Sequence, residues 1–263
     1  MVLVIRLIGL RNVLPDYQYL NTIRDYVTCW SNSILAAIKI YVMRKHSKEY
    51  LQNLTPYQGY ELLVDGNKRF VNNLQADQDH LEMINETREG QHPFAVILSC
   101  MDSRTSVELI FDQGLGDLFS IRVAGNVVNG DIIASIEYAI KYVGSKVLMV
   151  LGHTGCGAIK SAKEGVEDGY ITDLLRRIQP SITKALLSDE KGYLFHDKVA
   201  YANVENSLEE ILIRSEIVKG MFEKGQIGIV GGVYNIENGQ VDFFKNLTRK
   251  DRGRVGMSAV LNK

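Results

Sequence analysis

Short, largely apolar runs constrain the fold of this 263-residue chain more than any other feature of its sequence. The runs are residues 94–99 (FAVILS), 146–151 (KVLMVL) and 226–233 (QIGIVGGV). Runs of this length without polar alternation are typical of strands that are buried on both faces of a parallel sheet. Residues 118–123 are a further strand candidate, and Asn238-Gly239 predicts a hairpin-type turn into a last strand over residues 241–244.

Apolar residues recur at helical spacing between these runs. Helices are predicted over residues 57–74, 131–143 and 197–222. In the second of these helices, Asp131 can act as the N-cap and Gly144 as the C′ residue. Alternation of strand and helix indicates a parallel sheet with helices on its faces. The sequence therefore predicts an α/β fold with a mostly parallel central β-sheet flanked by helices.

The first 48 residues differ from the rest, because they show neither clear periodicity nor strong turn signals. We expect residues 1–48 to be an N-terminal extension and residues 49–263 to form one domain that carries the chemistry. Met43 is a candidate true start, since the sequence from there on reads like an ordinary protein start. The alternative is a helical arm that wraps a partner subunit. Recovery of peptides from residues 1–40 of the native protein by mass spectrometry would exclude the later start.

Composition narrows the partners and the compartment. The formal net charge is −1 and no basic stripe is present, so we expect no nucleic-acid partner. Residues 34–43 are apolar but interrupted by Lys39, and a membrane span needs about 20 apolar residues, so we expect no membrane insertion. Three cysteines, Cys29, Cys100 and Cys156, argue against a disulfide framework and for a reducing compartment, and we predict a cytoplasmic protein.

Two of these cysteines and one histidine stand directly after predicted strands. Cys100 follows the run 94–99, whereas His153 and Cys156 follow the run 146–151. Ligands bind beyond the carboxyl ends of parallel strands, so the three side chains converge in one crevice if the two strands are neighbours. Two thiolates and one imidazole suit Zn²⁺, and three protein ligands leave the fourth tetrahedral position open, as catalytic zinc sites require.

The residues around these three ligands have predicted roles as well. Arg104 can hold the Asp102 carboxylate away from a metal through a bidentate pair, so that Asp102 stays ionised and only accepts hydrogen bonds. Gly152, Gly155 and Gly157 are expected to let the backbone turn tightly from strand to helix. A helix that starts directly after the last cysteine is expected to favour its ionised thiolate through the helix dipole.

Five segments together resemble the β-carbonic anhydrases. The segments are C-M-D-S-R (100–104), G-D-L-F (116–119), R-V-A-G-N (122–126), S-I-E-Y-A (135–139) and G-H-T-G-C-G (152–157). D-G-N-K-R-F (65–70) and G-V-Y-N-I-E-N-G (232–239) look like the two ends of the family's domain, and the likeness covers residues 56–245. The pair C-x-D-x-R and H-x-x-C in this order is specific, although either motif alone would be weak.

This resemblance implies a reaction and a site. β-Carbonic anhydrases hydrate CO₂ reversibly to bicarbonate and a proton through attack by a zinc-bound hydroxide. The residues that match the family's ligands for one Zn²⁺ per subunit are Cys100, His153 and Cys156. Asp102 and Arg104 match the catalytic dyad of the family, and in some members the aspartate itself binds the zinc and closes the site.

The resemblance also implies a pocket, an assembly and a pH range. Gln91, Phe119 and Tyr138 fall where the family lines its narrow substrate pocket. Family members are built from dimers with sites near the subunit interface, so a homodimer or tetramer is expected. Because two thiolates cancel the charge of Zn²⁺, the metal should acidify water less than an all-histidine site does, and we predict an activity optimum on the alkaline side of neutral.

The chain departs from the family pattern at a few positions. Met101 stands where serine is usual, Thr105 where valine is usual and Val123 where asparagine is usual. Some members carry a non-catalytic bicarbonate site that uses a tryptophan. Here the one tryptophan, Trp30, lies outside the matched region, so that site is not expected.

Three other functions compete with CO₂ hydration on the same residues. A hydrolase for COS or CS₂ keeps the chemistry and changes the substrate, and the sequence does not decide between them. A non-enzymatic structural zinc or redox protein would need a fourth firm protein ligand for a closed zinc site. A cysteine phosphatase is excluded on electrostatic grounds, because Asp102 lies between Cys100 and Arg104 and would repel a phosphate.

Overall fold

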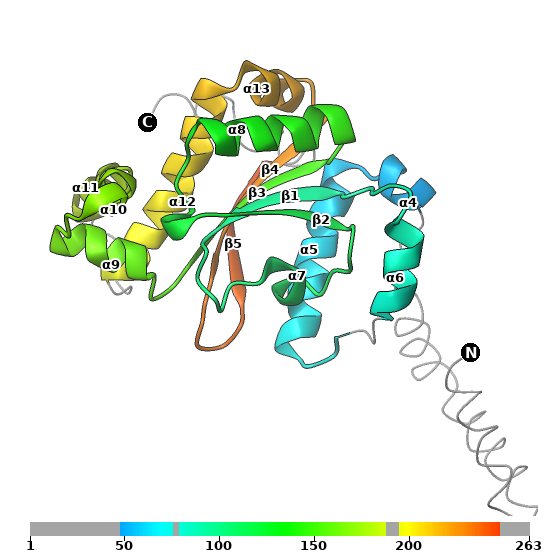
Figure 1. Cartoon of the computed structure of the whole chain (residues 1–263), viewed down its shortest axis with the longest axis horizontal. Helices are drawn as coiled ribbons and strands as arrows, with labels where there is room; N and C mark the ends of the chain where they lie inside the picture. Colours follow the sequence, from blue (N-terminus) through cyan, green and yellow to red (C-terminus); the bar gives the residue numbers. More distant parts are fainter. Residues whose placement is uncertain (1–47, 76–78, 188–194, 248–263) are drawn as a thin grey trace, which may run out of the picture. The chain divides into compact units, whose positions relative to one another are not determined.

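The computed structural model describes residues 48–75, 79–187 and 195–247. These residues form a five-stranded sheet in the order β2-β1-β3-β4-β5 (Figure 1). The strands are β1 (Ala95–Ser99), β2 (Leu118–Arg122), β3 (Val147–His153), β4 (Gly228–Tyr234) and β5 (Val241–Leu247). β1 to β4 pair in parallel and β5 is antiparallel to β4, so the predicted α/β fold with a mostly parallel sheet is confirmed.

Helices connect the strands and cover the sheet. They are α4 (Lys48–Asn53), α5 (Pro56–Val71), α6 (His80–Thr87), α7 (Val107–Ile110), α8 (Gly130–Glu137), α9 (Gly157–Glu164), α10 (Gly169–Arg176), α11 (Gln179–Leu187), α12 (Phe195–Arg214) and α13 (Glu216–Glu223), with the helical turns η2 (Ala124–Asn126) and η3 (Tyr138–Val143). The sequence predicted α5, α8, α9, α12 and α13 in outline and assigned none of the others.

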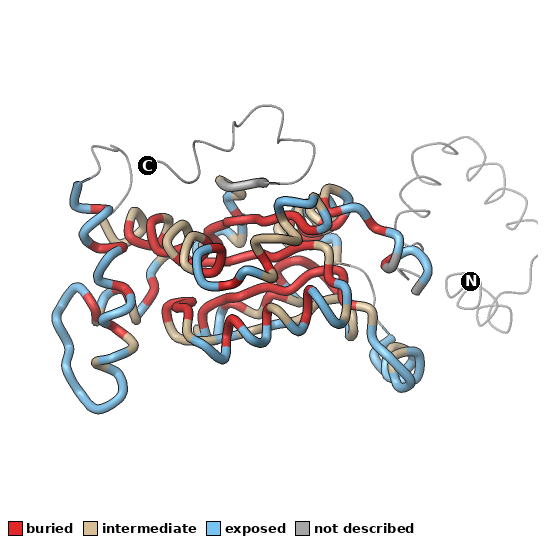
Figure 2. The backbone as a smooth tube through the Cα atoms, turned by 90° about the horizontal axis from the view of Figure 1, so that it is seen from above, coloured by how far each residue is buried: buried red, intermediate tan, exposed pale blue. Residues whose placement is uncertain are grey.

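Alternate residues of each buried strand pack into two different helical layers. Val96 and Leu98 of β1 belong to the core that includes α8, α12 and α13, whereas Ala95 and Ile97 belong to the core that includes α5 and α7. The two groups of helices lie on opposite sides of the sheet (Figure 1). Successive side chains of a strand point to opposite faces, so strands covered on both faces are apolar throughout. The central strands are accordingly buried along their length (Figure 2).

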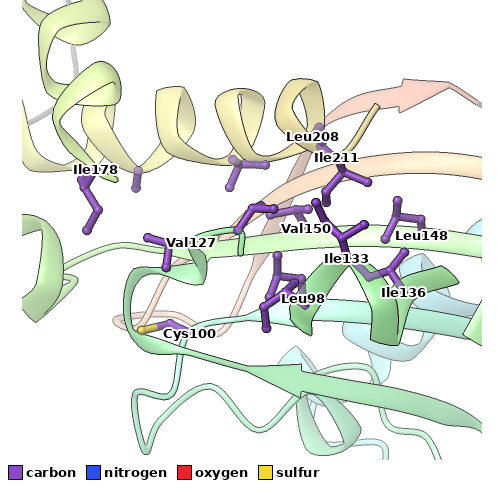
Figure 3. Close-up of a cluster of buried hydrophobic side chains, with 14 of the residues drawn as sticks. Leu98, Cys100, Val127, Ile133, Ile136, Leu148, Val150, Ile178, Leu208 and Ile211 are labelled. Atoms are coloured by element: carbon purple, nitrogen blue, oxygen red, sulfur yellow. The ribbon is translucent and has the colours of Figure 1, made fainter. Parts of the chain in front are cut away.

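The larger of these two cores leads to the carboxyl end of β1. In Figure 3, Leu208 and Ile211 of α12 lie over the sheet beside Val150 of β3 and Leu98 of β1. Cys100 lies at the margin of the same core, directly beyond the end of β1. A buried, apolar layer therefore supports one side of the candidate site.

The helix predicted over residues 131–143 begins earlier than expected. Its N-cap is Asn129, whose side chain accepts the N–H of Ile132 at 2.9 Å. Asp131 lies in the first turn of α8, so the prediction that it caps the helix was wrong. The first turn still favours its negative charge, because the helix dipole is positive there. Gly144 ends the helix in the left-handed region with φ 96°, as predicted.

The helix predicted over residues 197–222 is two helices, α12 and α13. Ser215 separates them with an extended backbone (φ −110°, ψ 100°), and its hydroxyl accepts the N–H of Val218 at 3.1 Å. A serine hydroxyl that accepts an N–H of the next turn stabilises the start of a new helix at that point. The predicted hairpin between β4 and β5 is present, with Gly239 at φ 78°.

Several predictions concern residues outside the described part of the chain. The extension over residues 1–48, apart from Lys48, lies there, as do Met43, Cys29 and Trp30. Within the described ranges, no helix combines the length and the apolar character that crossing a membrane requires.

Candidate metal centre

Two neighbouring strands bring three potential metal ligands together. β1 and β3 pair in parallel with Ser99 opposite Leu151, so Cys100, just beyond β1, lies beside His153 at the end of β3. Cys156 follows in the turn before α9. The two sulfur atoms are 4.0 Å apart, and the ligand atoms of all three side chains lie within 4.8 Å of one another. The adjacency on which the predicted crevice depended is therefore present.

The distances and one unpaired atom of this cluster fit a tetrahedral zinc ion. Sulfurs about 2.3 Å from a tetrahedral ion lie about 3.8 Å apart, close to the 4.0 Å observed. His153 Nδ1 lies 2.9 Å from the carbonyl oxygen of Thr154, which assigns the ring proton to Nδ1 and the lone pair to Nε2. Nε2 is buried and has no hydrogen-bond partner among the described residues. A buried polar atom without a partner is costly, and a bound cation removes that cost.

Hydrogen bonds stabilise the ionised form of Cys100. The Cys100 and Cys156 sulfurs form a hydrogen bond at 4.0 Å, which is the largest cause of the lowered pKa of Cys100. Because the pKa of Cys156 is raised, Cys156 is the donor. The backbone N–H of Gly125 donates to the Cys100 sulfur at 3.3 Å. Since zinc binds the thiolate rather than the thiol, these donors prepare Cys100 for a metal.

The pKa of Cys156 shifts in the opposite direction and corrects one expectation. Cys156 is the N-cap of α9, and the N–H groups of Ile159 and Ala158 favour its thiolate, as predicted. The hydrogen bond to Cys100 and burial outweigh these groups and raise the pKa of Cys156. Two adjacent thiolates repel each other unless a cation lies between them, so the second proton is expected to leave when a metal binds.

The three glycines of the turn after β3 have different reasons to be glycine. Gly155 has φ 63°, in the left-handed region that favours glycine. Gly152 is required for space, because a Cβ there would lie 2.8 Å from Val204 Cγ2 and 3.4 Å from the carbonyl oxygen of Ala200. Gly157 has neither a positive φ nor any atom within 4 Å of such a Cβ, so the expectation that the turn needs it was wrong.

Asp102 and Arg104 form a bidentate ion pair next to the cluster. Arg104 donates from Nε to Oδ1 at 2.8 Å and from Nη2 to Oδ2 at 2.7 Å, and its backbone N–H donates to Oδ1 at 3.0 Å. These bonds hold the pKa of the Asp102 carboxyl well below its usual range. Asp102 Oδ2 lies 4.0 Å from His153 Nε2. The carboxylate therefore reaches the edge of the ligand cluster while Arg104 binds both of its oxygens.

Within one chain, the structure does not bring Gln91, Phe119 and Tyr138 to this cluster. Gln91 precedes β1 whereas Cys100 follows it, so the two residues lie beyond opposite ends of this strand. Phe119 pairs with Val96 near the start of β1, about 13 Å along the strand from the cluster at 3.3 Å per residue. Tyr138 follows α8, which returns toward the start of β3, and is 58% exposed.

Polar residues to which sequence reasoning gave no role support the cluster from outside. Arg122, the last residue of β2, donates to the carbonyl oxygens of Cys100 and Asp102. Asn203 of α12 is 2% exposed and donates from Nδ2 to the carbonyl oxygen of Gly125 at 2.7 Å. The signal that could have revealed Asn203 is an amide on the apolar, buried face of a long helix.

Sequence comparison with known proteins points to one family. A family profile described as "Carbonic anhydrase" matches residues 95–241. "Carbonic anhydrase 2" of Mycobacterium tuberculosis is 34% identical over 196 residues, which cover 72% of this chain and 93% of the relative. A carbonic anhydrase of Mycolicibacterium smegmatis is 33% identical over 204 residues, 75% of this chain and 97% of the relative.

Comparison of the fold gives the same result. The structure of the β-carbonic anhydrase CcaA matches with a TM-score of 0.58 and 26% identity, and covers 71% of this chain and 95% of that one. A Coccomyxa β-carbonic anhydrase shares the fold at a TM-score of 0.57 and 22% identity, over 75% and 87% of the two chains. On these sequence and structural matches, the chain belongs to the β-carbonic anhydrase family of enzymes.

Proposed function

We propose that this chain hydrates CO₂ reversibly to bicarbonate and a proton, with one Zn²⁺ per subunit held by Cys100, His153 and Cys156. The observation that carries the proposal is the buried cluster of two thiols and an unpartnered imidazole nitrogen at the carboxyl edge of the sheet. When bound there, zinc supplies the Lewis acidity that lowers the pKa of water towards neutrality, and three protein ligands leave a coordination position for it.

We assign Asp102 the task of orienting the attacking oxygen. Because Arg104 keeps Asp102 ionised, its carboxylate accepts hydrogen bonds and donates none. A carboxylate at the edge of the cluster, 4.0 Å from His153 Nε2, can accept the remaining O–H of the nucleophile. The lone pair of the nucleophile would then point at the carbon of CO₂, and such an orientation lowers the activation barrier of the attack. Arg104 is the residue that holds this carboxylate in place.

The same ion pair disfavours a purely structural zinc site. A closed structural site needs four firm protein ligands. Among the described residues, Asp102 is the carboxylate beside the cluster, and Arg104 binds both of its oxygens. A site with three firm ligands and an occupied carboxylate suits catalysis better than a structural role.

We also propose a homodimer, or a tetramer built from two dimers, in which Gln91, Phe119 and Tyr138 of one subunit line the CO₂ pocket of the other. All three lie toward the edge of the sheet opposite to the metal cluster of their own chain. Phe119 belongs to β2, an edge strand that pairs with β1 alone within the described part of the chain. A second copy packed against the region of these three residues would cover Gln91 and Tyr138, whose side chains are exposed in one chain.

Parallel assays of the wild type and Cys156→Ser test the proposed reaction. The wild type is expected to bind about one zinc per chain and to hydrate CO₂, and the variant to lose most of both, because a serine hydroxyl does not replace a thiolate ligand. Zinc-loaded wild type that is inactive towards CO₂ at every pH would favour the structural role. Faster hydrolysis of COS or CS₂ than hydration of CO₂ would show that the preferred substrate is COS or CS₂ instead of CO₂.

A further inference from the structure

One turn carries both a proposed zinc ligand and the proposed orienting carboxylate. It runs from Cys100 to Thr105, and the N–H of Thr105 donates to the carbonyl oxygen of Asp102 at 3.0 Å. The N–H of Met101 donates to the carbonyl oxygen of Val123 at 3.2 Å, which ties the turn to the end of β2. The position of this turn therefore determines where both the Cys100 sulfur and the Asp102 carboxylate lie.

Arg122 binds this turn from the neighbouring strand. It is the last residue of β2 and pairs with Ser99, the residue before the turn. Its Nε donates to the carbonyl oxygen of Cys100 at 3.2 Å, and its Nη2 donates to the carbonyl oxygen of Asp102. A guanidinium is planar and always charged, so it fixes the two carbonyl groups relative to each other, which a flexible ammonium does not.

Thr105 binds the same two carbonyl groups from inside the turn. Its side chain is buried, and its hydroxyl lies 2.9 Å from the carbonyl oxygens of both Cys100 and Asp102. Arg122 Nη2 lies 3.4 Å from this hydroxyl, which ties the two residues to each other. Valine has the same shape as threonine but makes none of these bonds.

We propose that Arg122 and Thr105 are positioning residues that together hold the turn so that Asp102 stays on Arg104 instead of moving onto the metal. This inference rests on the proposed function. Asp102 Oδ2 is 4.0 Å from His153 Nε2, so a small shift of the turn changes the partner that the carboxylate meets. Two side-chain donors, beside the N–H of Thr105, bind the Asp102 carbonyl group and fix the backbone from which the side chain would swing.

Four variants separate positioning from packing. Thr105→Val removes the hydroxyl and keeps the shape, Thr105→Ser keeps the hydroxyl, and Arg122→Met removes the guanidinium. The matched control is Ser145→Ala, which removes a buried hydroxyl that donates to the carbonyl oxygen of Pro93 at 2.8 Å, at the start of the strands and away from the turn. For each variant we would measure kcat for CO₂ hydration, zinc content, thermal midpoint and the visible spectrum of the Co²⁺-substituted protein.

Thr105→Val is expected to lower kcat about tenfold at unchanged zinc content, because one hydrogen bond is worth about that factor. Thr105→Ser is expected to stay within about twofold of the wild type, and Arg122→Met to lose about 10- to 100-fold, since its donors are charged. In Thr105→Val and Arg122→Met the Co²⁺ d–d bands are expected to shift as a carboxylate joins the metal, while the thiolate charge-transfer bands remain. Ser145→Ala should lower the thermal midpoint and leave kcat and spectrum unchanged.

Wild-type kcat and spectra in both Thr105→Val and Arg122→Met would overturn the inference. Equal losses in Thr105→Val and Thr105→Ser would overturn it as well, because the hydroxyl would then be irrelevant. A wild type that binds Co²⁺ but does not hydrate CO₂ would contradict the proposed function alone. The spectral difference between wild type and Thr105→Val would still report whether the turn positions Asp102.

Discussion

His153 and Asp102 show how single residues prepare this site. His153 engages Thr154 through Nδ1 and leaves Nε2 buried without a hydrogen-bond partner among the described residues. The side chain of Asp102, in contrast, has its hydrogen bonds satisfied, because both of its oxygens accept hydrogen bonds from Arg104. Buried polar atoms in proteins are nearly always satisfied, so an unsatisfied nitrogen beside a satisfied carboxylate indicates where a cation belongs.

Replacing the Asp102 carboxylate by an amide tests its charge. Asp102→Asn is expected to keep zinc and to lower kcat about 100-fold or more, because an amide does not match the proton-accepting role of a carboxylate. Stopped-flow CO₂ hydration and metal analysis measure the two effects. The matched control is Asp65→Asn, which alters an exposed carboxylate 2.9 Å from Lys68 and should leave kcat unchanged. Wild-type turnover in Asp102→Asn would exclude the orienting role.

The pH profile should rise towards alkaline pH. Two thiolates cancel the charge of the metal, which weakens its acidification of water. The hydrogen bonds from Arg104 lower the pKa of Asp102, so this carboxylate stays ionised from mildly acidic to alkaline pH. Its titration therefore causes no change of rate within that range. The rate of CO₂ hydration measured from acid to alkaline pH at constant ionic strength checks this. A rate that is flat across that range would contradict it.

At the level of elements, the order of the strands builds the site. β1 and β3 are neighbours although 47 residues separate the end of β1 at Ser99 from the start of β3 at Val147. The crossover through β2 and α8 places the two carboxyl ends side by side, where ligands of parallel sheets bind. Burial of both strands on both faces fixes their register, because a slip of one residue would turn each side chain into the core on the other face, which is packed for different side chains.

Two glycines inside helices should respond oppositely to alanine. A Cβ at Gly66 of α5 would lie 1.7 Å from the carbonyl oxygen of Phe111. Gly66→Ala is therefore expected to lower the free energy of unfolding by about 3 kcal/mol, because backbone does not yield as a side chain does. Gly220 of α13 has no atom within 4 Å of such a Cβ and no positive φ. Gly220→Ala should therefore raise the free energy of unfolding by about 0.5–1 kcal/mol.

Urea denaturation of both glycine variants measures these changes. Gly220→Ala is the matched control, because it makes the same substitution in a helix interior without the close contact. Loss of stability of the same size at both positions would show that the contact of Gly66 with the backbone is not the cause.

The buried strand β1 was predicted closely, whereas the residues that cap two helix ends were not, for a physical reason. Burial on both faces leaves a continuous apolar run, and the run 94–99 differs from β1 by one residue. Helix ends depend on which of several polar side chains caps them. Asn129 and Asp131 are both good caps, and in the structure the side chain of Asn129 accepts the N–H of Ile132. Ser215 ended α12 in the same way.

At the level of the whole molecule, the proposed pocket residues lie away from the ligand cluster of their own chain. The ligands lie at the carboxyl edge of the sheet, whereas Gln91 and Phe119 lie toward the other edge. If a partner supplies the pocket, two defective chains should complement each other. A chain with Cys156→Ser retains the pocket residues, and a chain with Phe119→Ala and Tyr138→Ala retains the ligands.

Mixed dimers of these two chains test the arrangement. In a mixed dimer of twofold symmetry, one site combines both intact halves, so a random mixture should regain about a quarter of the wild-type activity by counting sites. Each variant alone should stay nearly inactive. If the pocket belonged to the same chain as the ligands, the mixture would remain as inactive as its components, and the proposed assembly would be wrong.

The sequence by itself determined the class of fold and the identity of the candidate ligands, because apolar runs and motif spacing are local properties of a chain. Only the tertiary structure decided that β1 and β3 are neighbours, that Asp102 sits between Arg104 and the ligand cluster, and that Arg122 reaches across from β2. It also placed Phe119 away from the cluster. Distances between segments far apart in sequence depend on the packing of the whole sheet and its helices, and no local pattern encodes them.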